Sequence, residues 1–550
     1  MSKIIVTAAL PYAYSIPHLG NFVGSILPAD VYYKYLRMDG HDAIFISGSD
    51  QHGTPIELKA LTEKVDPLIL ADQMHKEIEG LFDKLECTFT KYGKTHCDAN
   101  KEVVYEIFNM LKKNDYIKEV ENIQAFCNID KRFITDRFIE GTCPYCGGHA
   151  RGDQCDDCGK LLTPQQLINP VCKICGKSDI SFINERNLAL DLAKLELDVR
   201  AFIVKESPNN WTKNAINKSL SFLDEGLHSR EITRMMKWGF PVPLKGYEDY
   251  VFYVWFDAPI GYIGITKDWD AVKWKDYWFD KNTMLIQFMG KDNIEFHTVM
   301  WPAMLIGSKL GFVLPTTIRA SEFLLTKEFK FSKSKGVGLN IKTALEIADA
   351  DYWRFSLMYI YPETSDSEFS IEIFEEIINK VMNDKIGNLV NRVLIISQKN
   401  AEFIDNSIAP DEEHIKEIER LEADYVLKFE SIELREALRS VIALAEYGNM
   451  LMSKYQPWAL VKKKDDTSMH DFSMIMNLEK LIIYKLGILL WPFTPKASTQ
   501  ILSYFGFNTE PILSMLDVEA GSIELSTNKE IKPIFSKLSE EQKRKFDAFK

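Results

Sequence analysis

Six of the nine cysteines in this 550-residue chain stand in three C-x-x-C pairs between Cys143 and Cys175. The first two pairs, Cys143/Cys146 and Cys155/Cys158, are eight residues apart, which is the spacing of a zinc knuckle. Four thiolates fill a tetrahedral coordination sphere and leave no open position for water. The sequence therefore predicts a structural zinc at these four cysteines.

The third pair, Cys172 and Cys175, leaves two alternatives open. The family resemblance described below implies a fourth pair at the position where this chain has Cys127 and Asp130, and these two residues would then form a second, weaker metal site with Cys172 and Cys175. Otherwise the two thiols hold no ion. The pattern favours one zinc, with a second site at Cys172 and Cys175 as the alternative.

A second group of candidate residues lies near the N-terminus. The apolar run at 4–10 predicts a buried parallel strand, and the apolar spacing of 22–38 predicts a helix. A helix N-terminus that follows a strand directs free backbone N–H groups and a positive dipole end toward a ligand. Gly20 lets an anion approach the backbone, and His18 and Asn21 can donate to phosphate oxygens.

A basic loop, KFSKSKG at 330–336, is the other candidate phosphate site. Its lysines offer ammonium groups and its serines offer hydroxyl donors for a polyphosphate. On composition alone a solvated basic loop is the favoured interpretation of this segment. The chain has no G-x-x-x-x-G-K-[ST] loop, so the sequence offers no P-loop for a nucleoside triphosphate.

The composition is that of a globular protein, with 46% hydrophobic and 26% charged residues and a net charge of −13. This charge argues against indiscriminate binding to nucleic acid but allows a specific RNA partner on a local basic surface. No uncharged apolar run approaches the roughly 18–20 residues that span a bilayer. The N-terminal run lacks a cleavage site, so we expect a cytoplasmic protein.

Alternating strand-like and helix-like segments between about 31 and 117 predict a parallel α/β layer that positions these residues. Asp50 follows one predicted strand directly, at the sheet edge where ligands bind, and its carboxylate would meet a cationic group. After about residue 363 the pattern becomes helical. One predicted helix places Leu434, Leu438, Val441 and Ala445 on a single apolar face.

These motifs together resemble those of a known family. PHLGN at 17–21 and KFSKS at 330–334 are similar to the HIGH and KMSKS signatures of class I aminoacyl-tRNA synthetases. AALPYAYSIPHLGN at 8–21 and VWFDAPIGY at 254–262 resemble the methionyl-tRNA synthetase family in particular. There are two departures: Asn21 replaces the final histidine of HIGH and carries no charge, and Phe331 replaces the methionine of KMSKS.

The resemblance implies an α/β class I Rossmann-type catalytic domain, split by a zinc-binding connective insert and followed by a C-terminal α-helical anticodon-binding bundle. We expect the catalytic halves at 1–117 and 231–325, the insert at 118–230, the KMSKS loop and stem-contact region at 326–363, and the helical domain at 364–550. The insert is too short for the hydrolytic editing domain of relatives that handle Ile, Val or Leu. The chain ends soon after the helices, so we expect no appended tRNA-binding or dimerisation domain.

The resemblance also assigns the site residues. The implied catalytic residues are His18, Asn21, Lys330 and Lys333. The implied ATP-binding residues are Pro17, His18, Gly20, Asn21, Gly290, Asp292, Lys330, Ser332, Lys333 and Ser334. The implied methionine-binding residues are Leu10, Tyr12, Asp50, Trp255, Ala258, Pro259, Tyr262 and His297.

For the anticodon, the resemblance implies Asn388, Arg392 and Trp458. Asn388 and Arg392 are four residues apart and share a helical face, which suits the reading of base edges. Trp458 offers a stacking platform for an unstacked base, although on sequence alone a core tryptophan is favoured.

The implied activity joins methionine to tRNA(Met), including the initiator, through methionyl-adenylate, with Mg bound to ATP and a monomeric protein. Two alternatives remain. Another amino acid could be the substrate, which the aromatic pocket and the small insert oppose. The chain could also be a silent RNA- or partner-binding paralogue, which the intact PHLGN and KFSKSKG motifs oppose.

Overall fold

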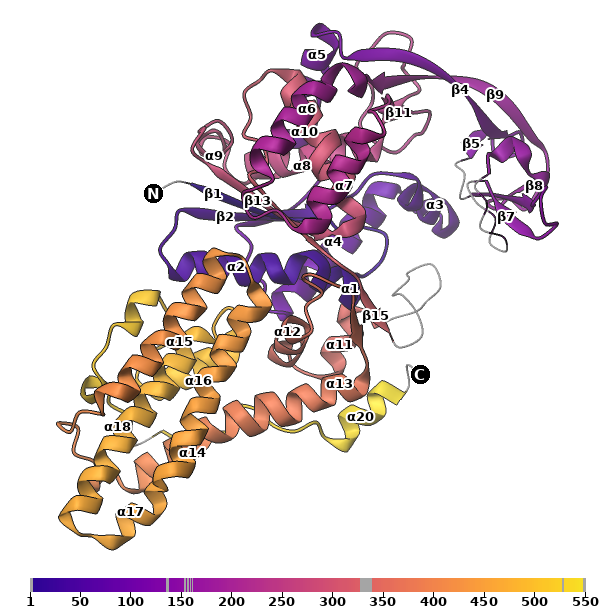
Figure 1. Ribbon diagram of the computed structural model, residues 1–550. Helices are drawn as coiled ribbons and strands as arrows, with labels where there is room; N and C mark the ends of the chain where they lie inside the picture. Colours follow the sequence, from indigo (N-terminus) through magenta and orange to yellow (C-terminus); the bar gives the residue numbers. More distant parts are fainter. Residues whose placement is uncertain are drawn as a thin grey trace.

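The computed structural model describes residues 3–134, 138–152, 155, 158, 160, 162–326, 339–526 and 529–547. Its central sheet has five parallel strands in the order β14-β13-β1-β2-β3 (Figure 1). The strands are β1 (Ile4–Ala8), β2 (Ala43–Ser49), β3 (Lys91–Lys94), β13 (Met284–Gly290) and β14 (Thr317–Ser321). The expected parallel α/β layer is confirmed. The chain leaves β1 toward β2 on one side and returns to β13 on the other, and this reversal opens a crevice at the carboxyl ends of β1 and β13.

Helices cover both faces of this sheet, as the two-residue period of β1 requires. Ile4 and Val6 pack in one core with α2, whereas Ile5 packs in a second core with α5, α8 and α10. The helices around the sheet are α1 (Leu19–Asn21), α2 (Leu27–Met38), α3 (Thr54–Glu63), α4 (Pro67–Lys84), α5 (Asp98–Lys113), α8 (Val254–Trp269), α9 (Trp274–Trp278) and α10 (Trp301–Ser308).

The insert leaves the body of the protein on a long antiparallel ribbon. Strands β4 (Ile117–Cys127) and β9 (Ile180–Leu190) pair along their full length, and small strands gather at the far end (Figure 1). The small strands are β5 (Arg132–Ile134), β6 (Ile139–Thr142), β7 (His149–Arg151) and β8 (Ile168–Cys172). After β9 the chain returns to the body of the protein through α6 (Leu192–Glu206), α7 (Lys213–Asp224), β10 (Arg230–Glu231), β11 (Thr233–Arg234) and β12 (Val251–Phe252). The ribbon brings Cys127 opposite Ile180, next to the third cysteine pair.

The last third of the chain is a helical bundle. A short segment with β15 (Leu324–Thr326), α11 (Ile341–Ile347), α12 (Ala350–Tyr359) and β16 (Ser367–Phe369) leads into it. The bundle consists of α13 (Ile371–Glu376), the π-helical segment η7 (Ile377–Gly387), α14 (Asn388–Lys399), α15 (Glu412–Glu430), α16 (Leu434–Tyr455), α17 (Pro457–Lys463), α18 (Asp466–Leu489), α19 (Pro495–Ser503) and α20 (Glu540–Asp547). The expected apolar face of α16 is confirmed, since Leu434, Leu438, Val441 and Ala445 are fully buried.

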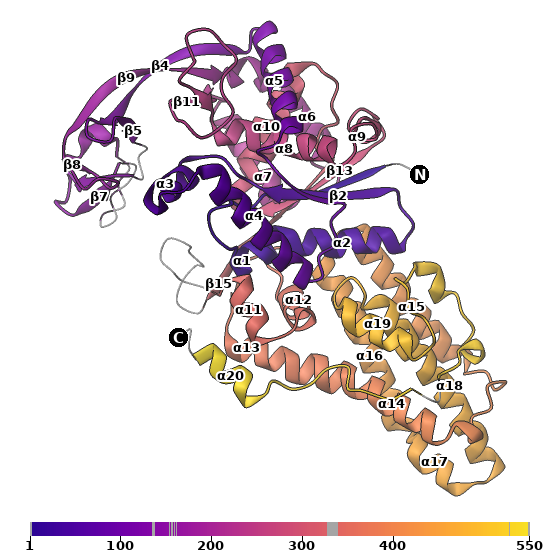
Figure 2. The ribbon, with the colours of Figure 1, turned by 180° about the vertical axis from the view of Figure 1, so that it is seen from behind.

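Helix α2 lies between the sheet and the bundle in both views (Figures 1 and 2). One apolar core runs without interruption from β1 through α2 and α12 into α16 and α18. Among the residues that the structure describes, no helix is long and apolar enough to cross a membrane.

Candidate active site

A cavity of about 790 Å³ opens at the carboxyl ends of β1 and β13. It is lined by every sequence-predicted ATP- and methionine-site residue that lies within the described part of the chain. These residues are Leu10, Tyr12, Pro17, His18, Gly20, Asn21, Asp50, Trp255, Ala258, Pro259, Tyr262, Gly290, Asp292 and His297. The predicted residues Lys330, Ser332, Lys333 and Ser334 lie outside the described residues.

One end of the cavity is walled by aromatic rings. Trp255 of α8 stacks on Phe296, with ring centroids 3.7 Å apart and an angle of 8° between the rings. Tyr12 meets Trp255 edge-on at 6.5 Å. These rings present an apolar, polarizable surface, which suits a thioether or another unbranched apolar side chain.

His297 closes the aromatic end as a neutral group. Its Nδ1 lies 2.9 Å from the carbonyl oxygen of Asn293, which can only accept, so Nδ1 carries the proton. Its Nε2 therefore accepts from the hydroxyl of Tyr262 at 3.0 Å. Burial lowers the pKa of His297 to about 4, so this wall of the cavity is uncharged at neutral pH.

Asp50 places one carboxylate in the same cavity. The side chain is buried, and the backbone N–H of His52 donates to its Oδ1 at 3.3 Å. Backbone hydrogen bonds on both sides hold the position, from Asp50 N to Pro11 and from Ala13 N to Asp50. Burial first, and then the neighbouring Asp257, raise the pKa of Asp50 well above its usual value. A buried carboxylate of this kind is stabilised by a cation brought to it.

The helix that begins at the cavity starts with a capping box formed by His18 and Asn21. His18 Nδ1 accepts from the backbone N–H of Asn21 at 3.1 Å, and Asn21 Oδ1 accepts from the backbone N–H of His18 at 3.3 Å. These reciprocal bonds cap α1 and hold both side chains beside the first turn. The short α1 continues through a π-helical turn (Phe22–Ile26) into α2.

Gly290 and Asp292 lie at the end of β13, across the cavity from α1. A Cβ at residue 290 would lie 2.7 Å from Asp292 Oδ1, so any side chain there would displace the carboxylate. The glycine therefore leaves room for Asp292 to face the cavity as an acceptor for hydroxyl groups.

Two features of the site could not be found from motifs alone. Phe296 was missed, although it directly precedes His297 in the sequence. His52 and Asp257 form a fully buried pair behind Asp50, and His52 Nε2 lies 2.7 Å from His96 Nδ1. His52 stands in the string QHGTP directly after Asp50, and Asp257 stands in VWFDAPIGY at 254–262, but neither string shows that the two side chains meet.

With the roles that the sequence resemblance implies for this cavity, we expect Phe296→Ala to raise KM for methionine about tenfold and to leave KM for ATP unchanged. The substitution removes the ring that supports Trp255, and a stacked aromatic pair contributes roughly 0.5–1.5 kcal/mol beyond the area that it buries. Methionine-dependent ATP–pyrophosphate exchange measures both constants. Phe403→Ala, at a half-exposed ring in the bundle, is the matched control. An equal rise in both KM values would contradict the assignment of this wall.

Two groups of side chains in the insert could hold metal ions. Cys143, Cys146, Cys155 and Cys158 place their four sulfurs within 4.8 Å of one another. The Sγ atoms of Cys143 and Cys158 are 3.9 Å apart, and those of Cys146 and Cys155 are 3.6 Å apart. The predicted four-thiolate cluster is thus assembled.

The second group combines the third cysteine pair with the start of the ribbon's turn. Ligand atoms of Cys127, Asp130, Cys172 and Cys175 also lie within 4.8 Å of one another. Cys127 Sγ is 3.6 Å from Cys175 Sγ, and Cys172 Sγ is 3.2 Å from Asp130 Oδ2. The structure therefore assembles the alternative set that the sequence left open.

Two of the three predicted anticodon residues, Arg392 and Trp458, are in contact in the bundle. The guanidinium of Arg392 on α14 lies over the ring of Trp458 on α17, 5.1 Å from its centroid. Trp458 is 38% exposed, so it is not the core tryptophan that sequence alone favours. Asn388 begins α14 on the exposed side, and its amide donates to Asp384 at 3.4 Å.

A parallel sheet with a cavity at its strand reversal, an insert with thiolate clusters and a helical bundle agree with the architecture expected of a class I aminoacyl-tRNA synthetase. A family model described as "tRNA synthetases class I (M)" matches residues 4–394, and "Anticodon binding domain of methionyl tRNA ligase" matches residues 405–549. The chain belongs to the methionyl-tRNA synthetase family.

Individual relatives are similar to this chain over nearly its whole length. A methionine–tRNA ligase of Pyrobaculum islandicum is 40% identical over 98% of this chain and 95% of its own length. A methionine–tRNA ligase of Borrelia turicatae is also 40% identical, over 98% of this chain and 73% of its own. A structure of Mycobacterium tuberculosis methionyl-tRNA synthetase in complex with methionyl-adenylate superposes with a TM-score of 0.80, at 22% identity, over 97% of this chain and 100% of that one. This last likeness shows the shared fold.

Proposed function

We propose that the protein is a methionine–tRNA ligase. It joins methionine to ATP, releasing pyrophosphate, and then transfers the methionyl group from the adenylate to the terminal ribose of tRNA(Met). The cavity of about 790 Å³ supports the proposal most directly. It brings an aromatic wall, a buried carboxylate and a helix N-terminus together in a chain of this family.

Each end of the cavity has a proposed role. The rings of Tyr12, Trp255 and Phe296 hold the thioether, with Leu10, Ala258, Pro259, Tyr262 and His297 completing the methionine pocket. The carboxylate of Asp50 binds the α-ammonium group. Shape and the neutral Tyr262–His297 pair then discriminate against charged side chains, because a thioether has no charged handle.

The remaining residues act on the nucleotide. In the first step a carboxylate oxygen of methionine attacks the α-phosphorus of ATP, and the bond to pyrophosphate breaks. His18, Asn21, Lys330 and Lys333 neutralise the charge that builds on the phosphates, with Pro17, Gly20, Ser332 and Ser334 beside them. Asp292, for which Gly290 leaves room, accepts from the ribose hydroxyls. No protein nucleophile is needed, so catalysis rests on positioning and electrostatics. Mg²⁺ bound with ATP supplies further charge neutralisation.

In this proposal residues 1–117 and 231–325 form the catalytic domain, 118–230 the insert, 326–363 the KMSKS and stem-contact region, and 364–550 the anticodon-binding domain. Asn388, Arg392 and Trp458 read the anticodon, with Trp458 stacking on a base. We further propose a cytoplasmic monomer that charges elongator and initiator tRNA(Met) alike.

The test is ATP–pyrophosphate exchange with methionine and a panel of the other amino acids. Exchange with methionine alone supports the proposal. Exchange with a different amino acid keeps the class and overturns the pocket. No exchange by folded, zinc-replete protein, together with binding of tRNA, identifies a silent RNA-binding paralogue.

Zinc is the proposed ion of both thiolate clusters. A tetrahedral zinc with bonds of about 2.3 Å needs sulfurs about 3.8 Å apart, and the separations of 3.9 and 3.6 Å in the first cluster agree with this value. Four ligands close each site, so both ions would be structural. The second cluster replaces one thiolate with Asp130, and we propose that it binds zinc more weakly.

We expect two zinc ions per chain in zinc-replete protein and one in the Asp130→Ala and Cys172→Ser variants. On graded chelation the wild type should release the second-cluster ion first. Elemental analysis after gel filtration measures the stoichiometry. Cys97→Ser, at a cysteine outside both clusters, is the control. If the wild type binds one zinc ion and Asp130→Ala also binds one, only the first cluster is a zinc site and the proposed second site is wrong.

A further inference from the structure

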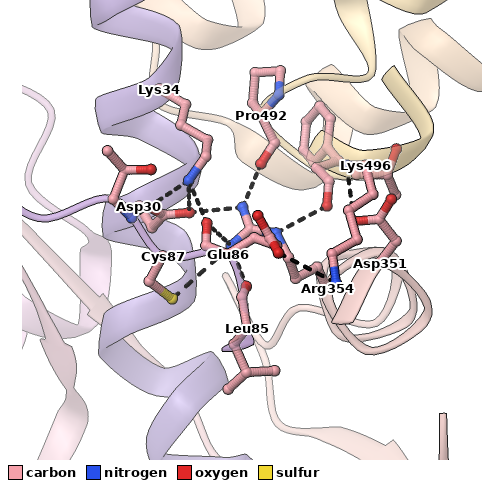
Figure 3. A network of polar contacts seen from close by, with 12 residues as sticks. Asp30, Lys34, Leu85, Glu86, Cys87, Asp351, Arg354, Pro492 and Lys496 are labelled. Carbon is pink, nitrogen blue, oxygen red and sulfur yellow. Dashed lines mark hydrogen bonds and ion pairs between the residues drawn. The ribbon is translucent and has the colours of Figure 1, made fainter. Parts of the chain in front are cut away.

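A buried guanidinium joins three separate parts of the chain. Arg354 of α12 is fully buried, and its Nη2 pairs with Asp30 of α2 at 2.7 Å (Figure 3). The same nitrogen donates to the carbonyl oxygen of Pro492 at 2.6 Å, and Nε donates to that of Phe493 at 3.1 Å. Nη1 donates to the carbonyl oxygen of Leu85 at 3.2 Å. One side chain thus holds α2, the end of α4 and the α18–α19 connection.

A lysine is the second cation on Asp30 at this junction. Lys34 Nζ donates to both carboxylate oxygens of Asp30 at 2.7 Å and to the carbonyl oxygen of Glu86 at 2.7 Å. Burial alone would raise the pKa of Asp30, but Lys34 and then Arg354 hold it below its usual value. Asp30 is therefore an ionised partner for two cations in a dry environment.

A second residue of α12 holds the bundle from one turn away. Asp351 accepts from the backbone N–H of Ala497 at 2.7 Å and from that of Lys496 at 3.4 Å, at the first turn of α19. A carboxylate at a helix N-terminus satisfies free N–H groups and interacts favourably with the helix dipole. Arg354 and Asp351 together fix α12 against both sides of the 492–497 segment (Figure 3).

The chemistry of these contacts suits orientation better than stability. Buried ion pairs add little net stability over well-packed apolar residues, whereas forked charge-assisted hydrogen bonds have narrow geometry. The apolar core that runs from β1 into the bundle already joins the two parts. What the polar contacts add is a fixed angle between α2, which continues the helical segment that begins at the cavity, and the bundle that carries Arg392 and Trp458.

We propose that Arg354 and Asp351 are positioning residues for the charging of tRNA. They hold the bundle at the angle at which one tRNA meets the Arg392–Trp458 face and the cavity together. This inference rests on the proposed function, because it needs the cavity and that face to act on the same tRNA.

The experiment compares Arg354→Met and Asp351→Asn with the wild type in two reactions. The first is methionine-dependent ATP–pyrophosphate exchange, which needs the cavity alone. The second is charging of tRNA(Met) and of the same tRNA with its CAU anticodon replaced. Arg354→Met keeps the unbranched apolar stem and leaves Asp30 paired with Lys34.

We expect exchange to stay within about twofold of the wild type, while kcat/KM for tRNA(Met) falls roughly 10- to 100-fold in Arg354→Met, since small misplacements of a bound substrate have effects of that size. Charging of the anticodon-substituted tRNA should not change, so the ratio of the two kcat/KM values shrinks. Asp351→Asn, which keeps one acceptor, should show a smaller loss of the same kind. Arg420→Met, at an exposed arginine of α15, should change neither reaction.

Each other outcome is informative. Unchanged tRNA(Met) charging in Asp351→Asn and Arg354→Met overturns the inference. A parallel fall in exchange and in the charging of both tRNAs also overturns it, because the junction would then only maintain the fold. If Arg354→Met does not fold, Asp351→Asn and Arg354→Lys decide the question. Absence of methionine-dependent exchange in the wild type counts against the proposed function instead.

Discussion

Asp50→Asn is expected to raise KM for methionine on the order of 10²- to 10³-fold in ATP–pyrophosphate exchange, with KM for ATP nearly unchanged. Asp50 is the buried carboxylate that lines the cavity near the aromatic wall. Removing one partner of a buried ion pair costs roughly 3–5 kcal/mol, because the remaining charge is left uncompensated. The amide has the same shape, so the cavity itself should keep its form.

The pH dependence separates this role from a structural one. Burial and Asp257 raise the pKa of Asp50 in the free protein, whereas a bound ammonium group lowers it. Methionine binding therefore releases a proton wherever Asp50 is protonated, and its affinity should weaken as the pH falls through the raised pKa. In Asp50→Asn this dependence should vanish.

Tryptophan fluorescence, with Trp255 in the cavity wall, can report methionine binding from pH 5 to 8. A methionine analogue without the α-amino group should bind wild type and variant equally. Identical pH profiles for methionine in the two proteins would remove Asp50 from the ammonium site.

The features that the sequence predicts correctly are determined by residues close together in the chain. The alternation of apolar residues in β1, the position of Asp50 after β2 and the buried face of α16 each depend on neighbours within one or two turns. Strand β1 ends at Ala8, before the expected residue 10, because Pro11 and the bridge between Tyr12 and Asp50 draw the chain away from β13. That early end is what points Leu10 and Tyr12 into the cavity.

The features that could not be predicted from the sequence depend on contacts between residues far apart in the chain. The Trp255–Phe296 stack joins α8 to the turn before α10, and His52 meets Asp257 across 205 residues. Arg354 reads as an ordinary charged residue within a helix, yet tertiary packing buries it. The second metal cluster was left open for the same reason, since only the pairing of β4 with β9 brings Cys127 to Cys175.

Lys333→Ala is expected to lower the rate of adenylate formation roughly 10²- to 10³-fold, the usual cost of removing one donor to a charge that develops in the transition state. Methionine affinity should change by no more than about threefold, because the apolar and ammonium ends of the cavity are formed by other residues. Lys333 lies outside the described residues, so this expectation rests on the similarity of KFSKS to KMSKS and on the phosphate-binding role that we propose for His18 and Asn21.

Rapid-quench measurement of methionyl-adenylate gives the rate, and equilibrium fluorescence gives the affinity. Lys335→Ala is the matched control, since it removes the same charge from the same loop outside the five-residue motif. The role of Lys333 is decided by comparing the change in the rate of adenylate formation with the change in methionine affinity. Removing a group that binds the phosphates equally in the ground and transition states weakens the affinity for ATP and leaves the rate of adenylate formation unchanged. Removing a group that acts on the developing charge lowers the rate of adenylate formation. Equal losses in rate and methionine affinity would show that Lys333 supports the cavity as a whole, and the transition-state role would then fall to His18, Asn21 and Lys330.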